Sequence, residues 1–375
     1  MKTRLLIYGV EEFAGALISR RAAGAAFAHI AAGGDIARVA THANAMSRAR
    51  AGLVEPRIFG LGDKSRLATQ LDDVAVLVNC SPRFSKTSPA LIDACLATGT
   101  HYLDICSERL NLSQVLARND EAERAGIVLI AGTSFDVAAA DAMSARLATL
   151  LPAARNLTIA VHRSPLSRAE AGSLIAACRV PGETLKNGRL TTSSPANSSV
   201  DVDFYNGEET AFLAPWRCEG ISAQHRGPFT TVNSYEVLHP ALTRLLKRAG
   251  IRRWMFRHGY RLAALERRIA GRRAGPTDKQ LSRSRSIVWG EARAPDGSVR
   301  RARLEAPAAH LYTADATLLI SRILLSGNVA PGFRWPSEVG GAALVEEIDG
   351  VTWRELADPS ETMTPDLPVQ VVAST

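Results

Sequence analysis

The first third of the chain alternates short apolar runs with longer stretches that favour helix. Residues 4–8 are apolar and end before a glycine, and residues 13–32 are rich in alanine, a strong helix former. We interpret residues 35–43 as a second strand, and residues 72–81 as a third strand that is buried on both faces. Because further helix–strand pairs follow, the pattern predicts a Rossmann-like, doubly wound parallel sheet of the α/β class over residues 1–145.

After about residue 150 the pattern changes. Polar and apolar positions alternate between loops that are rich in glycine, proline and serine. This predicts a second, α+β domain with a mainly antiparallel sheet over residues 150–305. Within it, two alternating runs around Asp296 and Gly297 predict a β-hairpin. Residues 310–327 predict an apolar helix that ends at a glycine. We expect residues 355–375 to form a poorly ordered tail.

Composition places the chain among globular proteins. Its 375 residues are 46% hydrophobic and 22% charged, which is sufficient for about two domains with sizeable cores. The five cysteines form no CxxC pair and no metal-ligand spacing, so we expect a reducing compartment and no metal site. The N-terminus is unlike a signal peptide, and no apolar run reaches the ~18 residues of a membrane-spanning helix. These features predict a cytoplasmic location.

The net charge of +8 leaves several interpretations open. It could mark an acidic partner, or it could reflect an arginine-rich proteome. The basic, helix-prone stretch 239–273 could bind an anionic membrane surface or an acidic carrier protein, or it could simply cover the protein's own core. Nucleic acid is the least expected partner, because no nucleic-acid-reading motif accompanies the charge.

Several short motifs follow one another along the chain. They are YGVEEFAG from Tyr8, NCSPRF from Asn79, GTHYLDICSE from Gly99, SFDVAAAD from Ser134, YTADA from Tyr312 and PGFRWPSEVGG from Pro331. Together they resemble the saccharopine dehydrogenase-like oxidoreductases, in particular the branch of trans-acting enoyl reductases. The resemblance covers residues 3 to about 345. It implies that the segment of about 308–345 packs back on the first domain, and that the second domain serves substrate binding and homodimerisation.

The resemblance also implies an NADP site at the first turn. The residues it places beside the cofactor are Gly9, Glu12, Phe13, Gly15, His42, Cys80, Ser81, Arg83 and Phe84. Glu12 stands where the family has a glycine, and its carboxylate would crowd and repel a phosphate. Alternatively, Glu11 and Glu12 only favour the start of a helix through its dipole. Pro82 and Ser134 also replace family glycines, so dinucleotide binding itself stays open, with Arg83 as one compensating charge.

Cofactor choice depends on the end of the second strand, where an acid binds the ribose hydroxyls of NAD and a basic group binds the 2′-phosphate of NADP. We place His42 at that position, with no acid adjacent to it in our assignment. This predicts that NADPH binds more tightly than NADH. The alternative is that His42 is an ordinary surface residue.

The chemical candidates are Tyr102, Asp104 and Asp136. They follow predicted strands, and their side chains could exchange the proton that accompanies hydride transfer. Alternatively, the two aspartates cap the turns that follow them. The resemblance implies an NADP-dependent reductase of an activated double bond in a small-molecule or carrier-bound acyl substrate of lipid or polyketide-like secondary metabolism. Reduction of a C=N bond is also open. The competing hypothesis is a non-redox descendant that binds acyl groups, carrier proteins or membranes, or that works without a cofactor.

Overall fold

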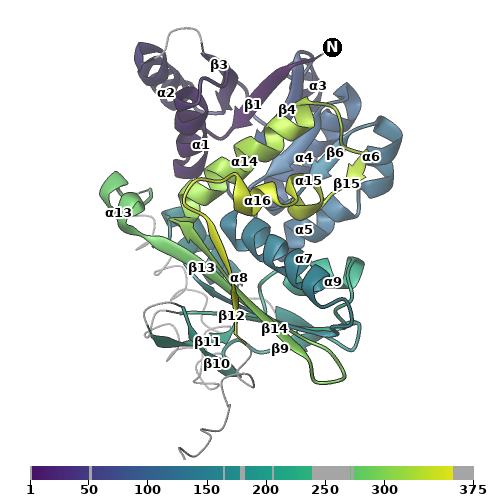
Figure 1. Ribbon diagram of the computed structural model, residues 1–375. Helices are drawn as coiled ribbons and strands as arrows, with labels where there is room; N and C mark the ends of the chain where they lie inside the picture. The colour runs from purple at the N-terminus through teal and green to yellow at the C-terminus, as the bar shows by residue number, and fades with distance from the viewer. Residues whose placement is uncertain are drawn as a thin grey trace, which may run out of the picture.

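Two β-sheets organise the residues that the computed structural model describes, which are 2–49, 53–163, 165–177, 182–204, 207–238, 271 and 274–357. Figure 1 shows the first sheet above and the second below, with helices between them. The basic stretch 239–273 lies outside the described residues except for Gly271. The fold class predicted from the sequence is confirmed: a parallel Rossmann-like sheet is followed by a mixed, mostly antiparallel one.

The first sheet is parallel throughout. Its strands are β1 (Arg4–Tyr8), β2 (His29–Gly33), β3 (Val54–Ile58), β4 (Val74–Asn79), β5 (His101–Asp104), β6 (Val128–Ile130) and β15 (Gly332–Phe333), in the spatial order β15-β6-β5-β4-β1-β2-β3. β1 lies between β2 and β4. The chain runs from β1 to β2 on one side and from β4 to β5 on the other, so the order of the strands reverses between β1 and β4. Open α/β sheets bind ligands beyond the carboxyl ends of the strands at such a point.

The second strand predicted from the sequence is wrong. Residues 35–43 fall largely within helix α2 (Ile36–Ala49), and the strand lies earlier, at His29–Gly33. The alanine-rich stretch 13–32 obscured this boundary, because alanine favours helix and β2 (HIAAG) has few of the residues typical of strands. β3 was missed because its Pro56 interrupts the apolar pattern; β3 is the edge strand of the sheet, where proline is tolerated.

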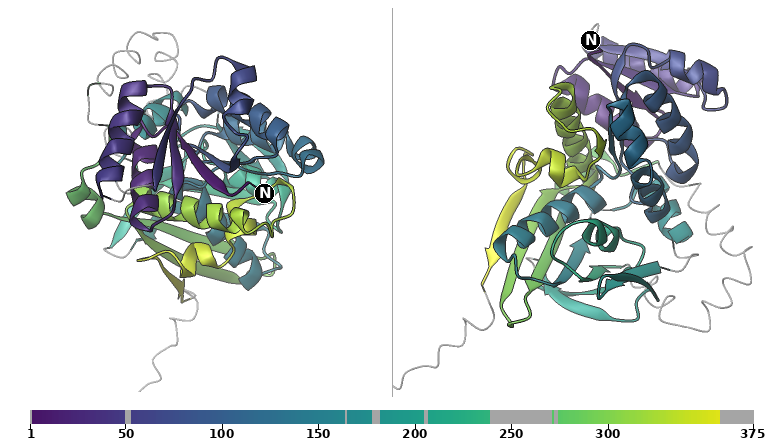
Figure 2. Two further views of the ribbon diagram at one scale, coloured as in Figure 1. Left: turned by 90° about the horizontal axis from the view of Figure 1, so that it is seen from above. Right: turned by 90° about the vertical axis from the view of Figure 1, so that its right-hand side faces the viewer.

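Helices cover both faces of the first sheet. They are α1 (Phe13–Gly24), α2, α3 (Lys64–Thr69), α4 (Phe84–Thr98), α5 (Arg109–Leu116) and α6 (Asn119–Ala125). Successive residues of a strand point to opposite faces. Accordingly, Leu5 and Ile7 pack in the core with α1 and α2, whereas Leu6 and Tyr8 pack in the core with α3 to α6. Figure 2, seen from above, shows the strands between these two layers.

The second sheet contains nine strands among the described residues. They are β7 (Asn156–His162), β8 (Gly182–Lys186), β9 (Arg189–Ser193), β10 (Ser199–Asp203), β11 (Glu208–Leu213), β12 (Thr231–Glu236), β13 (Arg285–Arg293), β14 (Val299–Pro307) and β16 (Thr352–Leu356). The predicted hairpin is confirmed as β13–β14. β7 and β12 are a parallel pair. The expected tail begins too early, because Glu355 and Leu356 still pair with β14.

Three elements join the sheets: a π-helical turn η1 (Phe135–Ala139), helix α7 (Ala140–Leu150) and helix α14 (Ala309–Leu325). α14 is the apolar helix predicted over 310–327. It contacts α1, β4 and β5 of the first domain and β14 of the second. Arg21 on α1 donates two hydrogen bonds to Asp315 on α14, at 2.5 and 2.6 Å. One core cluster therefore runs from the first sheet through α14 and α7 to the second.

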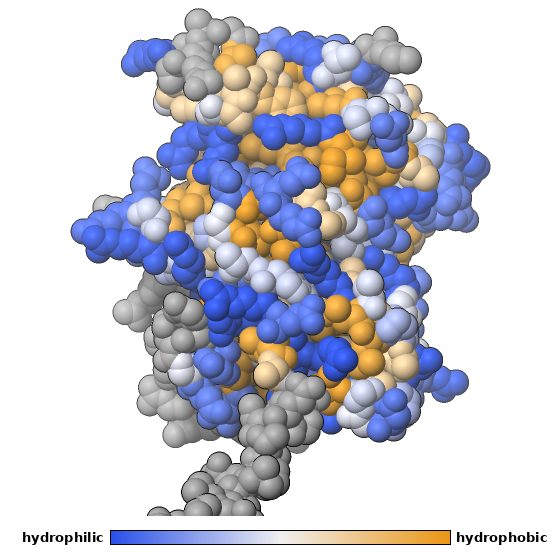
Figure 3. Space-filling model, viewed as in Figure 1, coloured by the Kyte–Doolittle hydropathy of each residue, from blue (hydrophilic) through white to orange (hydrophobic). Residues whose placement is uncertain are grey.

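Smaller helices complete the fold. They are α8 (Arg168–Ala177), α9 (Glu219–His225), α13 (Asp278–Arg283), α15 (Pro336–Gly340) and α16 (Ala343–Glu346). In Figure 3, apolar residues gather mainly over the upper part of this face, where the first domain lies, and in smaller patches over the second. Among the described residues, no helix is both long and apolar enough to span a membrane.

The junction around α14 predicts a clear stability effect. Tyr312 is fully buried, meets the Phe135 ring edge-on at 5.5 Å, and donates a hydrogen bond to the Leu344 carbonyl. Tyr312→Ala should lower the free energy of unfolding by about 3–5 kcal/mol, because it leaves a cavity in the shared core. Tyr312→Phe should cost only about 1 kcal/mol, for the lost hydrogen bond. Denaturant unfolding measures both; equal, small losses would contradict this packing.

Candidate functional site

The turn between β1 and α1 has the backbone of a phosphate-binding turn. Gly9 adopts a φ of +91°, and a Cβ there would lie 2.9 Å from the Ser81 nitrogen. A Cβ on Gly15 would overlap the Gly9 carbonyl oxygen. The two glycines therefore let β1, α1 and the β4–α4 loop meet closely. The first N–H groups of α1, from Phe13 onward, lack helical partners and face the space beyond the turn, as an anion site requires.

Glu12 is the N-terminal flanking residue of α1, and its side chain makes no capping hydrogen bond. Its carboxylate lies 4.0 Å from the Arg38 guanidinium, and the side chain is 27% exposed. The Glu12 carboxylate, which would repel a phosphate at the turn, thus lies on the side of α2. Arg83 directly precedes α4. Its backbone is in the left-handed region, with a φ of +61°, and its side chain is exposed. Cys80 and Phe84 on either side of that loop are buried.

His42 does not lie at the end of a strand. It is on α2, and its Nε2 lies 2.8 Å from the Ser19 hydroxyl, which also contacts His29 Nε2 at 2.7 Å. Burial, with the nearby His29 and Arg20, lowers the pKa of His42 to about 4. A neutral imidazole in this place carries no charge for a 2′-phosphate. The basis of the NADPH preference is therefore wrong, because β2 ends at Gly33 and an acid, Asp35, follows it.

Tyr102 and Asp104 lie at the carboxyl end of β5, and both are fully buried. Asp104 accepts hydrogen bonds from Cys106 N, Gly132 N, Asn111 Nδ2 and the Tyr102 hydroxyl, at 2.8–3.0 Å. These bonds tie β5 to the loop after β6. The arrangement favours the capping interpretation of Asp104 over a catalytic one, since its oxygens are already occupied by donors of the protein.

Asp136 lies in a different environment, at the start of η1 between the two domains. Arg163 donates to its Oδ2 at 2.7 Å, and Arg217 approaches its Oδ1 at 3.7 Å without a hydrogen bond. The same two arginines pair with Glu236 and Glu219, at 2.7 and 2.6 Å. Burial lowers the pKa of each arginine, but the surrounding carboxylates outweigh it and raise that pKa. Buried charges of this kind persist only as a paired network.

A second pair, absent from the sequence-based candidates, adjoins this network. His310 at the start of α14 lies 2.7 Å from Glu170 on α8, through its Nε2, and meets the Phe13 ring edge-on at 5.1 Å. Its Nδ1 is buried and has no hydrogen-bond partner among the described residues. Burial raises the pKa of Glu170, but His310 and then Arg163 outweigh it and bring the pKa to about 2.

Only part of this pair was visible in the sequence. Ser167 and Glu170 have the spacing of a capping box, and the Ser167 backbone N–H does donate to Glu170 at 2.6 Å. Nothing in the sequence linked Glu170 to His310, which is 140 residues away. The structure therefore brings Phe13, the first residue of α1, into contact with a His–carboxylate pair that long-range packing alone creates.

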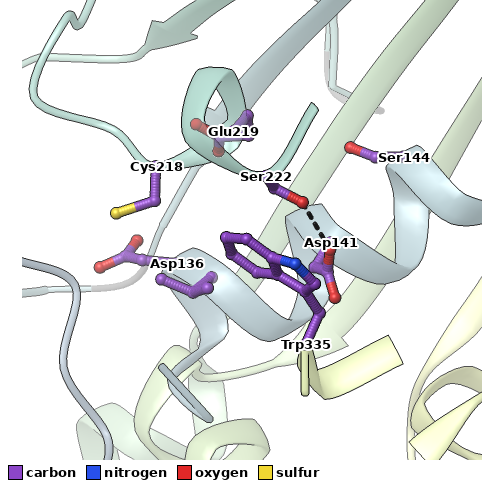
Figure 4. A pocket seen from close by; sticks show the side chains of 8 residues that line it. Asp136, Asp141, Ser144, Cys218, Glu219, Ser222 and Trp335 are labelled. Atoms are coloured by element: carbon purple, nitrogen blue, oxygen red, sulfur yellow. Dashed lines mark hydrogen bonds between the residues drawn. The ribbon is translucent and has the colours of Figure 1, made fainter. Parts of the chain in front are cut away.

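A small cavity lies between η1, α7, α9 and the start of α15. Asp136, Asp141, Cys218, Ser222 and Trp335 are among its lining residues (Figure 4). In this view Asp136 and Cys218 lie on one side of the Trp335 indole, and Asp141 lies on the other with its hydrogen bond from Ser222. Its volume, about 10 Å³, is that of a single water site. The cavity is therefore too small for a substrate.

In the part of the chain that the structure describes, no group of three or more histidine, cysteine, aspartate or glutamate side chains could hold a metal ion.

The environment of Asp104 predicts a pH effect on stability. Burial raises its pKa from 3.8 to about 6, against the hydrogen bonds that lower it. Between about pH 4 and pH 6 the folded protein then holds a proton that the unfolded chain releases, so the free energy of unfolding should fall as pH rises through this window. Asp104→Asn does not titrate and should flatten that part of the profile. Denaturant unfolding of both proteins at several pH values measures the difference; parallel profiles would refute it.

Comparison with known proteins agrees with this architecture. A family model described as the saccharopine dehydrogenase NADP binding domain matches residues 31–130, and it supports NADP(H) as cofactor. The match begins after the β1–α1 turn. No curated protein matches the chain.

Among solved structures, the saccharopine dehydrogenase (L-Glu forming) from Saccharomyces cerevisiae superposes with a TM-score of 0.62 at 13% identity, covering 95% of this chain and 100% of that one. A short-chain dehydrogenase from Sphingobium yanoikuyae in complex with NADPH has a TM-score of 0.27 at 16% identity, covering 34% of this chain and 70% of that one. The chain therefore has the fold of saccharopine dehydrogenase, and its residues 31–130 match the NADP-binding domain of that family.

Proposed function

We propose that the protein is a reductase that uses a reduced nicotinamide dinucleotide to saturate an activated double bond in an acyl substrate. The observation that carries the proposal is the closeness of the β1–α1 turn to the His310–Glu170 pair, with Phe13 in contact with the imidazole. The turn offers free N–H groups for a diphosphate, and the pair offers a proton. The matched family domain supports the dinucleotide, and the motif resemblance supports the enoyl substrate.

Each part of the site has a role in this proposal. The dinucleotide, when bound, supplies the hydride. Glu170 holds the His310 ring by Nε2, so that Nδ1 is the atom free to pass a proton to the substrate. Arg163 connects the two groups of charges, because it pairs with Asp136 and also lowers the pKa of Glu170. The cavity beside Asp136, with a volume of about 10 Å³, leaves room for little water near that carboxylate.

The alternative is a non-redox descendant of the fold. Two acidic side chains, Glu11 and Glu12, stand at the turn where a dinucleotide would bring its diphosphate. That observation favours loss of the cofactor, and a failure of every nicotinamide dinucleotide to bind would select this alternative. The lateral position of Glu12, toward Arg38, favours the reductase.

Substrate class is tested by turnover. With a 2-enoyl thioester as substrate, the protein should oxidise the reduced dinucleotide. The reaction is measured as the decrease in the dinucleotide's near-ultraviolet absorbance. An amine mixed with a 2-oxo acid, which forms a C=N bond, should react much more slowly. The opposite order would contradict the enoyl substrate and leave an imine reductase.

The proton-transfer role of His310 gives a further prediction. His310→Gln should lower kcat by about 10²-fold or more and leave the affinity for the dinucleotide nearly unchanged, because general acid catalysis contributes about 10²–10⁴-fold. Glu170→Gln should lower kcat and shift its pH profile, since the partner that orients the ring is lost. His225→Gln is the control, because His225 is exposed at the end of α9. Equal rates for all three variants would exclude the pair from the chemistry.

A further inference from the structure

Glu11 reaches from the β1–α1 turn to the end of β2. The two strands are paired as far as Tyr8 and Ala32, and the Gly9 and Val10 N–H groups both donate to the Ala32 carbonyl. From that turn the Glu11 side chain extends to the next loop, where its Oε1 accepts a hydrogen bond from the Gly34 N–H at 2.9 Å. The carboxylate is thereby held beside the last residues of β2.

The backbone beside Glu11 is shaped for this side chain. A Cβ on Gly33 would overlap the Glu11 carboxylate, so the carboxylate can take this position because residue 33 is glycine. The second oxygen, Oε2, is buried and has no hydrogen-bond partner in the described part of the chain. A buried carboxylate oxygen without a donor is unfavourable, and a hydroxyl group of a ligand at the turn would supply that donor.

The surroundings of Glu11 suit an adenosine. Asp35 is exposed just beyond Gly34, and it accepts the Arg38 N–H. Ile36 and Ile58 are exposed large apolar side chains, 67% and 42% accessible, near the ends of the paired strands β2 and β3. Apolar side chains there can contact a flat base, and carboxylates can accept hydrogen bonds from ribose hydroxyls. His42, the nearest histidine on α2, is directed to Ser19 instead.

We propose that Glu11 reads the adenosine ribose of the cofactor and selects an unphosphorylated 2′-hydroxyl, so that this protein prefers NADH to NADPH. The proposal rests on the dinucleotide-dependent function above and refines its cofactor. A 2′-phosphate would bring about −1.5 to −2 charges against the Glu11 carboxylate, whereas a 2′-hydroxyl donates to it. The family match to an NADP-binding domain starts at residue 31, so it does not include Glu11.

The test is calorimetric titration of the full-length protein with NADH and with NADPH, on the wild type and on two variants. The wild type should bind NADH at least about tenfold more tightly, a ratio equivalent to ~1.4 kcal/mol. Glu11→Gln keeps the shape and the acceptor for Gly34 but removes the charge. It should narrow the ratio of the two dissociation constants by about fivefold or more, mainly through tighter NADPH binding.

Glu12→Gln is the matched control. It removes a charge from the neighbouring residue, whose carboxylate is directed to Arg38 rather than to Gly34. It should change both affinities together and leave their ratio unchanged, because the diphosphate is common to both dinucleotides. Thermal unfolding of each variant confirms that it is folded.

The outcomes separate the two proposals. Wild-type protein that binds NADPH as tightly as NADH, or more tightly, overturns the role of Glu11 and leaves the reductase intact. A preference for NADH that Glu11→Gln does not alter overturns the assignment to this residue. If neither dinucleotide binds to the wild type or to either variant, the proposed function fails and the role of Glu11 fails with it.

Discussion

The site depends on the burial of one helix, α14, between the two sheets. Its first turn carries His310, and its buried face bonds to the loop that leads into η1: the Thr317 and Thr133 hydroxyls lie 2.7 Å apart, and Thr313 accepts the Phe135 N–H at 3.0 Å. Because that loop leads directly to Asp136, a single helix positions both His310 and Asp136. Its sequence, apolar on nearly every side, is what a helix surrounded by protein requires.

A network of buried charges lies between the two sheets. Asp136, Glu219 and Glu236 are held with Arg163 and Arg217 away from water, and Glu170 is linked to the same network through Arg163. A buried network of this kind is weak evidence for stability, because desolvation offsets most of its attraction. What the network provides is a fixed arrangement of these side chains between the two sheets.

The sequence predicted the parts of the structure that depend on local pattern. The parallel sheet, the β13–β14 hairpin and α14 all follow from apolar spacing and turn residues. It misplaced β2, because the alanine-rich composition continues on both sides of Gly24, where α1 ends, and hides the change from helix to buried strand. Because the strand was placed too late in the sequence, the residue expected to select between NAD and NADP was assigned to His42 instead of to the end of β2 at Gly33.

The candidate site was predicted only in part, for a related reason. Gly9 and Gly15 could be recognised because their backbone role is local. The His310–Glu170 pair and the contact of Glu11 with Gly34 arise from chain segments that meet only after folding. Asp104 was visible as a polar residue after a strand, but whether its oxygens face a ligand or four donors of the protein is decided by tertiary packing.

The most direct test of the account is a crystal structure of the protein with a reduced dinucleotide bound. We expect the diphosphate within hydrogen-bond distance of the backbone N–H groups of Phe13, Ala14 and Gly15, with the adenosine ribose at Glu11 and the nicotinamide toward His310. A dinucleotide bound elsewhere on the molecule, or with its diphosphate away from the β1–α1 turn, would contradict it.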